Sequence, residues 1–266
     1  MFRCLEKITF VFMKTISIFG TGNVAFHMIK AISLLKNYKI LQVYGRSEQK
    51  HYDFSNEFNF DLKTTSDLNE IQPADFYLVC IKDDAIEEFI EKIARPNIIC
   101  MHTSGSLPLL DKNCKNAVFY PLQTFSKSSE LNYAEIPFCI EAKEADVFKK
   151  IEELALAISD SVFSISTEQR RSLHVSAVFV CNFVNHLYSL GEEICKEKGV
   201  PFDILKPLIK ETASKVQQIS PTEAQTGPAK RNDQNTIQSH LSQLSSIDQK
   251  NIYQLLTNSI LKTYGY

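Results

Sequence analysis

A glycine-rich turn near the start of the chain carries the residues best suited to a defined chemistry. Residues 20–25, GTGNVA, fit the pattern G-x-G-x-x-A. Gly20 would allow a tight turn, Gly22 would let the backbone approach a pyrophosphate, and Ala25 would let a helix pack closely on a strand. Free N–H groups at the start of that helix would bind phosphate charge. A glycine turn without a ligand is the alternative. The cofactor-binding residues predicted here are Gly20, Thr21, Gly22, Asn23 and Val24.

The type of dinucleotide is indicated at the end of the second apolar run. An NAD site usually carries Asp or Glu there, which accepts a hydrogen bond from the ribose 2′-hydroxyl. This chain has Arg46 and Ser47 instead. A guanidinium and a hydroxyl suit a 2′-phosphate, and charge-assisted hydrogen bonds of this kind contribute roughly 1.5–3 kcal/mol each. We therefore expect NADP rather than NAD, with a solvated turn arginine as the alternative.

The segment IKDDAI, residues 81–86, follows the next apolar run. Ligands of open α/β sheets bind outside the carboxyl ends of the strands, so Ile81 is expected beside the cofactor. Asp83 and Asp84 are suited to capping the following helix, and we expect that role rather than catalysis.

The segment CMHTSGS, residues 100–106, ends another apolar run and is expected at the nicotinamide end of the same site. Thr103 is predicted to bind cofactor, and His102 and Ser104 to serve the reaction. A serine hydrolase is not indicated, because Ser104 lacks the G-x-S-x-G turn. The alternative for Ser104 is to cap a helix over residues 107–112, and both roles can hold together.

Polar residues of the second half supply further candidates. His174 lies on an otherwise apolar helical pattern that also contains Asn182. Such residues need partners when buried, so His174 either faces substrate or is a satisfied core histidine. Gln123, Thr226 and Arg231 are predicted on the substrate side, although turns and helix starts explain those segments equally well.

These residues would together support hydride transfer to a small C=O or C=N compound. Such a reaction needs a proton donor, and histidine is the natural choice near neutral pH. The predicted catalytic residues are therefore His102 and His174, with Ser104 and Asn182 as orienting groups.

The elements that must position these residues change character along the chain. Up to about residue 166, short apolar runs alternate with helical patterns, which predicts βαβ units and a mostly parallel sheet. From residue 167 the patterns are helical only. We expect an α/β protein with an N-terminal doubly wound Rossmann domain over residues 13–166 and a smaller all-helical domain over residues 167–266. Residues 1–12 are interpreted as an N-terminal extension, because Met13 directly precedes the first apolar run.

Composition excludes several classes of partner. The net charge of −2 gives no field that would attract nucleic acid or an anionic membrane. No uninterrupted apolar run approaches the roughly 20 residues of a membrane span, and no signal peptide is recognised. The seven cysteines form no C-x-x-C pair and the six histidines are dispersed. We therefore expect reduced cysteines, a cytoplasmic protein and no bound metal.

The combined motifs resemble a known family. FGTGNVA, DDAI, HTSGS, PLQTFS, HVSAVFVCNF and TGPAKRND are similar to those of Rossmann-like oxidoreductases that join an NADP-binding domain to a helical domain of unknown function. The resemblance covers nearly the whole chain from Met13. It implies kinship with pyrroline-5-carboxylate reductase, ketopantoate reductase and the β-hydroxyacid dehydrogenases. It also implies a homodimer formed through the helical domain, with a small-molecule substrate held between the two domains.

One departure from these relatives concerns catalysis. The β-hydroxyacid dehydrogenases use a lysine with a nearby asparagine on the first long helix of the second domain. The matching helix here carries His174 and Asn182 and has no lysine between Arg171 and His186. Lysine-based acid catalysis therefore cannot be carried over. The alternative function is a catalytically silent protein that senses NADP.

Overall fold

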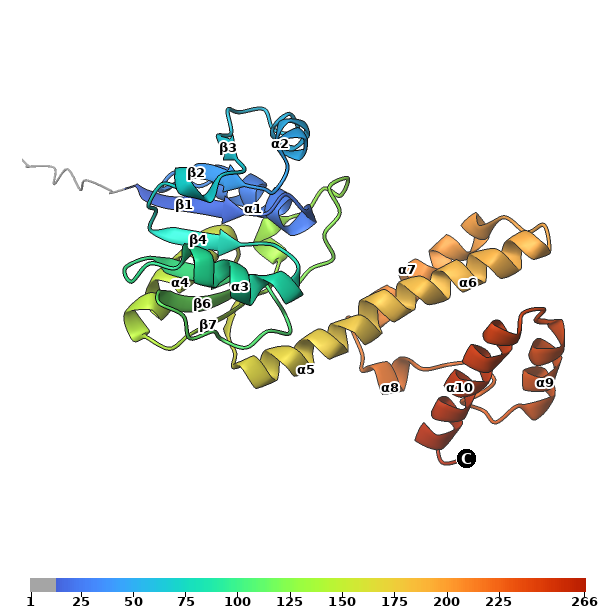
Figure 1. Ribbon diagram of the computed structural model, residues 1–266. Coiled ribbons are helices and arrows are strands. Elements are labelled where there is room, and N and C mark those ends of the chain that lie inside the picture. The colour runs from blue at the N-terminus through green and yellow to red at the C-terminus, as the bar shows by residue number, and fades with distance from the viewer. Residues whose placement is uncertain (1–12) are drawn as a thin grey trace, which may run out of the picture. The chain divides into compact units, whose positions relative to one another are not determined.

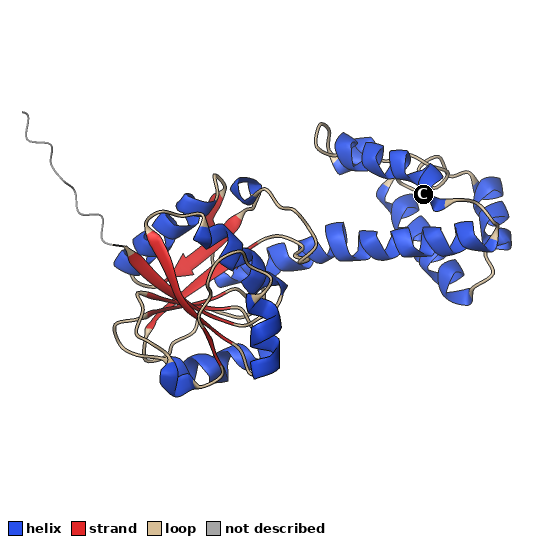
Figure 2. Cartoon of the chain, turned by 90° about the horizontal axis from the view of Figure 1, so that it is seen from above, coloured by secondary structure: helices blue, strands red, loops and turns tan. Residues whose placement is uncertain are grey.

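The structure is a computed structural model that describes residues 13–266, apart from the side chains of residues 50–52. The predicted N-terminal extension, residues 1–12, lies outside the described residues. The chain divides into two compact units between Val178 and Phe179. The first unit contains every described strand, and the second is helical (Figure 2). The division lies inside the helix that starts at Thr167, and the functional boundary at residues 166 and 167 stays a prediction.

One eight-stranded sheet forms the first unit, in the order β3-β2-β1-β4-β5-β6-β7-β8. All neighbouring strands are parallel except β6 and β7, which are antiparallel. This arrangement confirms the expected fold class, a mostly parallel Rossmann-like sheet followed by a helical region. The strands are β1 Lys14–Phe19, β2 Tyr38–Tyr44, β3 Thr64–Thr65, β4 Phe76–Val79, β5 Ile99–His102, β6 Lys115–Pro121, β7 Phe138–Ala142 and β8 Val162–Ser164.

Helices cover both faces of this sheet (Figure 1). On one face, α1 (Asn23–Ser33) and α4 (Ala145–Ile158) bury their apolar sides against alternate strand residues such as Ile18 and Leu78. On the other face, α3 (Asp83–Ile93) packs on Tyr77 and its neighbours. Strands buried on both faces must be apolar at nearly every position, which is why the predicted runs were continuous. The shorter elements of this unit are α2 Glu48–Ser55, η1 Leu68–Glu70 and η2 Tyr133–Glu135.

One long helical stretch, Thr167–Glu197, joins the two units in sequence. It comprises α5 (Thr167–Ala177), the π-helical turn η3 (Val178–Phe183) and α6 (Val184–Glu197). A capping box of Ser166 and Gln169 starts it, and Gly199, with φ of 65°, follows its end. Among the described residues this stretch alone is long and apolar enough to cross a membrane by length and composition.

The second unit continues with short helices. Helices form along its length, in agreement with the helical patterns that the sequence shows after residue 167. The elements are η4 Phe202–Leu205, α7 Lys206–Lys215, α8 Pro221–Ala224, α9 Gln234–Gln243 and α10 Ile247–Thr263.

The helix expected over residues 107–112 does not form. Ser104 Oγ does accept the N–H groups of Ser106 and Leu107, as a cap would, at 3.1 and 3.0 Å. The backbone groups of residues 107–109 form hydrogen bonds with side chains of α5 instead of the hydrogen bonds of a helix. Leu107 O accepts from the buried Arg170 guanidinium, and the Leu109 N–H donates to Thr167 Oγ1. A tertiary contact has replaced the local hydrogen bonds of a helix.

Candidate functional site

Gly20 follows β1 in a conformation that a side chain would prevent. Its φ is 125°, and a Cβ there would lie 2.2 Å from the carbonyl oxygen of Cys80, the residue after β4. Its N–H donates to Tyr44 O at 2.8 Å. The turn therefore brings the ends of β1, β2 and β4 together, and only glycine permits that approach.

The N-terminus of α1 is open to an anion. Gly22 is its N-cap, no side chain caps the first N–H groups, and the first turn has no acidic residue. A Cβ built on Gly22 would meet nothing within 4 Å. Unsatisfied N–H groups and the positive end of the helix dipole favour a phosphate at this position.

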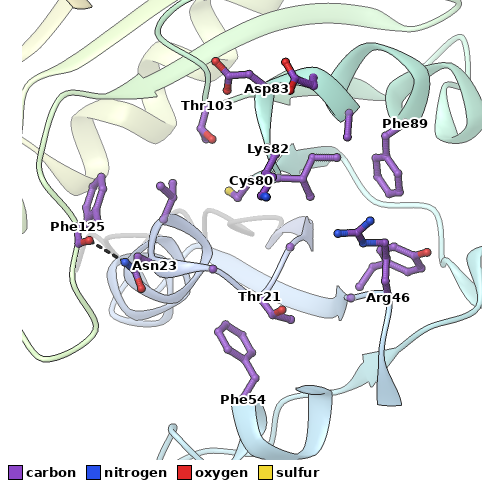
Figure 3. Close-up of a pocket in the computed structure, with 18 of the residues that line it drawn as sticks. Thr21, Asn23, Arg46, Phe54, Cys80, Lys82, Asp83, Phe89, Thr103 and Phe125 are labelled. Atoms are coloured by element: carbon purple, nitrogen blue, oxygen red, sulfur yellow. Dashed lines mark hydrogen bonds between the residues drawn. The ribbon is translucent and has the colours of Figure 1, made fainter. Parts of the chain in front are cut away.

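These elements border an open cavity of about 1130 Å³ along the carboxyl ends of β1, β2, β4 and β5. Ligand pockets commonly measure about 300–1,000 Å³, so the space suffices for an extended dinucleotide. Figure 3 shows Arg46 and Phe89 at one side of the cavity and Thr103 and Phe125 at the other. The predicted residues that line it are Gly20, Thr21, Gly22, Asn23, Val24, Arg46, Ile81, Thr103 and Gln123.

Cationic side chains lie at several points around this cavity. Arg46 lines it and, in the described part of the chain, forms no ion pair, which leaves its charge available to a ligand. Lys82 and Lys92 also line it, and neither was predicted. Lys127 is already paired with Glu57 and lies 4.9 Å from the centre of the Phe54 ring. Ser47 does not line the cavity.

One wall of the cavity is held in place by a histidine that no sequence pattern indicated. His27, fully buried on α1, donates from Nε2 to Ser126 O at 2.8 Å, and its Nδ1 bonds the Tyr133 hydroxyl at 3.0 Å. One turn earlier, Asn23 Nδ2 donates to Phe125 O at 2.9 Å. Two residues of α1, four positions apart, thus attach the segment that carries Gln123 and Phe125.

Asp83 connects the loop after β5 to the start of α3. Its Oδ2 accepts the hydroxyls of Ser104 at 2.7 Å and Ser106 at 2.6 Å. The N-cap of α3 is Lys82, so the expected capping role of Asp83 is wrong. Its carboxylate bonds across to the neighbouring loop because the ends of β4 and β5 are adjacent in the sheet.

His102 is buried, with 1% of its surface exposed. Its Nε2 donates to Pro108 O at 3.1 Å, and its Nδ1 accepts the Ser104 N–H at 3.3 Å. Since a carbonyl can only accept and an N–H can only donate, this ring is held neutral. Burial lowers its pKa to about 4, against a smaller opposing effect of the Pro108 hydrogen bond.

The depressed pKa of His102 predicts a pH-dependent stability. The unfolded chain takes up a proton near pH 6.5, whereas the folded protein does so only near pH 4. Stability is therefore full above pH 6.5 and falls by about 3 kcal/mol as the pH drops to 4. Urea denaturation at several pH values should show this slope, and His102→Gln should flatten it. The exposed His240→Gln is the control, and an equal slope in both variants would contradict the assignment.

Like His27 and Tyr133, Tyr120 and His174 form a histidine–tyrosine pair within the first unit. The Tyr120 hydroxyl and His174 Nδ1 are 2.9 Å apart, and their rings meet edge to face. Burial raises the pKa of Tyr120 to about 12. A Cβ on Gly105 would lie 2.6 Å from His174 Nδ1 and 2.9 Å from Tyr120 Cζ. The pair therefore packs on the loop that begins with the cavity-lining Thr103.

A buried arginine fixes the helix that carries His174. Arg170, fully buried, pairs with Glu141 on β7 and donates to Leu107 O. Thr167 also donates to Glu141, from its backbone N–H at 2.9 Å. These bonds join the first turn of α5 to the sheet, one turn before His174.

The remaining predicted residues are not brought to the cavity. Asn182 lies exposed in η3, and Thr226 and Arg231 lie exposed in the second unit. None of the three lines the cavity. Their roles stay predictions. Among the described residues no group of His, Cys, Asp or Glu could hold a metal ion.

Two family models match the chain. Residues 15–99 match the model described as NADP oxidoreductase, coenzyme F420-dependent, and residues 136–260 match a domain of unknown function, DUF2520. No curated protein matches it.

Solved structures extend these matches to the whole chain. A protein of Bacteroides fragilis described as a "putative NADP oxidoreductase" is 38% identical, with a TM-score of 0.85, covering 95% of this chain and 99% of that one. A protein of Thermotoga maritima is 19% identical, with a TM-score of 0.70, covering 94% and 98%. The pyrroline carboxylate reductase of Plasmodium falciparum, solved with NADP bound, is 15% identical, with a TM-score of 0.55, covering 94% and 92%. The last two share the fold alone.

Proposed function

This chain belongs to the NADP oxidoreductase family in which a nucleotide-binding domain precedes a DUF2520 domain, and we propose that it transfers hydride between NADPH and a small C=O or C=N compound. One observation carries the proposal. The uncapped N-terminus of α1 opens into a cavity of dinucleotide size whose wall includes the unpaired Arg46. NADPH, when bound, supplies the hydride.

The proton is assigned to His174 rather than to His102. Both ring nitrogens of His102 bond the backbone, and its pKa of about 4 keeps it neutral at physiological pH. His174 is partly exposed and bonds Tyr120 through Nδ1 alone. In the imidazolium form of His174, Nδ1–H donates to the Tyr120 hydroxyl oxygen, which orients the ring. The Nε2 proton would then pass to the developing alkoxide or amine and leave a neutral imidazole.

Turnover is the test of this function. NADPH oxidation should be followed by absorbance with a panel of keto acids and cyclic imines, alongside NADPH binding by fluorescence. Oxidation that depends on one class of substrate supports the proposal. Tight NADPH binding with no turnover of any compound would contradict it and would indicate the silent sensor instead.

The preference for NADP is assigned to Arg46. Replacing it by alanine should raise the dissociation constant of NADPH about 10- to 100-fold, because one charge-assisted contact to the 2′-phosphate is lost. The dissociation constant of NADH, which has no 2′-phosphate, should change little. Lys39→Ala, which removes an exposed cation at the opposite end of β2, is the matched control. Equal effects on both nucleotides would contradict the assignment.

The second unit supports a proposal about the partner. Its buried apolar side chains are Ala229 and Ile237 only. Large apolar side chains are instead exposed over several of its helices, far more than a stable monomer usually exposes. They include Phe179, Val180, Phe183, Leu187, Ile204, Leu208, Val216, Ile219, Ile247, Leu255 and Leu256. A homodimer formed through this unit would cover them.

Light scattering after gel filtration should give twice the mass of the chain. Phe183→Asp, which places a charge beside Phe179 in a ring pair of 5.1 Å, should shift the protein toward monomer. Phe60→Asp, at an exposed phenylalanine of the first unit, should leave the mass unchanged. A monomeric wild type, or a chain recovered only with detergent, would contradict the dimer.

The free cysteines among the described residues are consistent with a reducing cytoplasm.

A further inference from the structure

Two thiols outside the cofactor cavity lie together on neighbouring strands. Cys100 is in β5, and Cys114 immediately precedes β6. The strands are parallel, with Cys100 opposite Asn116, and the Lys115 N–H donates to Ile98 O at 3.0 Å. Asn116 is the register partner of Cys100, and Cys114 comes two residues before Asn116. Because side chains alternate along a strand, Cys114 is on the same face of the sheet as Cys100. Both belong to the apolar cluster beneath α3, and the Cys114 thiol donates to Asn116 Oδ1 at 3.5 Å.

The two thiols differ in access to solvent. Cys100 is 1% exposed, in the core between the sheet and α3, whereas Cys114 is partly exposed at the edge of that core. The Cys100 S–H stabilises a thiolate on Cys114, which lowers the pKa of Cys114 and raises that of Cys100. A partly exposed thiol with a lowered pKa is the reactive member of such a pair, and the buried thiol can resolve it.

A bond between the two sulfurs requires a small movement of the backbone. Diagonal neighbours in a sheet have Cα atoms about 7–8 Å apart, and a disulfide needs less than about 7 Å. Closure therefore requires a small shift of one residue. Cys114 can supply it, because it ends a short turn whose hydrogen bond is to Lys112 O and lies before the first ladder residue of β6.

We propose that Cys100 and Cys114 are a reversible dithiol–disulfide pair that is oxidised by hydroperoxides. The Cys114 thiolate attacks one peroxide oxygen, the O–O bond breaks, and the second oxygen leaves as water after protonation. The Cys100 sulfur then attacks the resulting sulfenic acid, forms the S–S bond and releases a second water. Two thiols lose two hydrogens and two electrons, hydrogen peroxide is reduced to two waters, and a dithiol reductant reverses the change.

The position of the bond connects it to the cavity. β5 contains Cys100 and His102 and is followed by Thr103 at the cavity wall, and β6, which begins directly after Cys114, contains Tyr120. The disulfide would cross-link the two strands that carry the histidine loop and the partner of His174. The proposal is independent of the reaction that the protein catalyses.

Peptide mapping tests the pair directly. The full chain is treated with hydrogen peroxide, alkylated without reduction and digested with trypsin. Cleavage after Lys92, Lys112 and Lys115 yields peptides 93–112 and 113–115, which hold Cys100 and Cys114. They should be recovered joined, with the mass of their sum less two hydrogen atoms, and should separate after treatment with dithiothreitol.

Cysteine variants distinguish the thiol that reacts with peroxide from the thiol that then forms the disulfide. Cys114→Ser should abolish the joined peptide and leave Cys100 reduced, whereas Cys100→Ala should leave Cys114 as a sulfenic acid that dimedone traps. Cys181→Ser, at the exposed cysteine of the second unit, should leave the joined peptide unchanged. Recovery of Cys100 and Cys114 as reduced thiols when Cys181 is oxidised would overturn the proposal. So would oxidation of Cys114 to sulfinic acid beside a reduced Cys100.

Discussion

Replacing Gly20 by alanine should cost the protein both its stability and its nucleotide binding. The new Cβ would lie 2.2 Å from Cys80 O and 2.9 Å from the carbonyl carbon, both backbone atoms next to a central strand. The φ of 125° is strained for any residue with a side chain. We expect a loss of about 3–5 kcal/mol of unfolding free energy and a fall in Tm of roughly 6–15 °C. Thermal denaturation and NADPH fluorescence measure the two effects.

Gly22→Ala is the matched control, because it should change nucleotide binding without changing the stability of the fold. Its Cβ would meet no protein atom within 4 Å, and the backbone there is extended rather than left-handed. Tm should therefore stay near that of the wild type. The NADPH dissociation constant should rise about 10- to 100-fold, since the Cβ would occupy the approach of a pyrophosphate. A Gly22→Ala protein that binds NADPH normally would show that the phosphates lie elsewhere.

Replacing His174 by glutamine should lower turnover about 100- to 10,000-fold, the usual contribution of a general acid. The dissociation constant of NADPH should not change, because His174 does not line the cofactor cavity. Tyr120→Phe should lower turnover less, roughly tenfold, since the imidazole remains but loses the hydroxyl that orients it. Single-turnover oxidation of NADPH with the best substrate of the panel measures both variants.

A second histidine of the chain provides the control for this pair. His240 Nδ1 bonds the Tyr253 hydroxyl at 2.8 Å, and the two rings meet edge to face as those of His174 and Tyr120 do. His240→Gln should leave turnover unchanged. Gly105→Ala, whose Cβ would displace His174, should act in the same direction as His174→Gln. Unchanged turnover in both His174→Gln and Gly105→Ala would contradict the assignment of His174 as the proton donor.

The two histidine–tyrosine pairs of the first unit follow one principle. His27 attaches the segment 123–127 to α1, and His174 lies against the loop after β5, so each histidine joins an element to a loop at the carboxyl edge of the sheet. Loops carry the functional groups of α/β proteins, and rigid elements must hold them at fixed positions.

The sequence by itself determined the fold class and the cofactor side of the site. Continuous apolar runs predicted the strands, since a parallel sheet buried on both faces needs apolar residues at almost every position. β3, with two threonines, is too short to give a periodic pattern. The spacing of Gly20, Gly22 and Ala25 predicted the turn, and the end of the second apolar run indicated Arg46. All of these depend on short stretches of chain, so pattern alone could reveal them.

Only the tertiary structure decided which polar residues meet. Tyr120 and His174 are 54 residues apart, His27 and Ser126 are 99 apart, and neither pair leaves a local signature. Long-range bonds also overruled local preference, as when Arg170 and Thr167 took the backbone groups of residues 107–109 and no helix formed there. Burial and two backbone hydrogen bonds hold His102 neutral, which its residue type and position did not reveal. Composition and spacing carry no information about burial or long-range partners, which arise only when the chain packs.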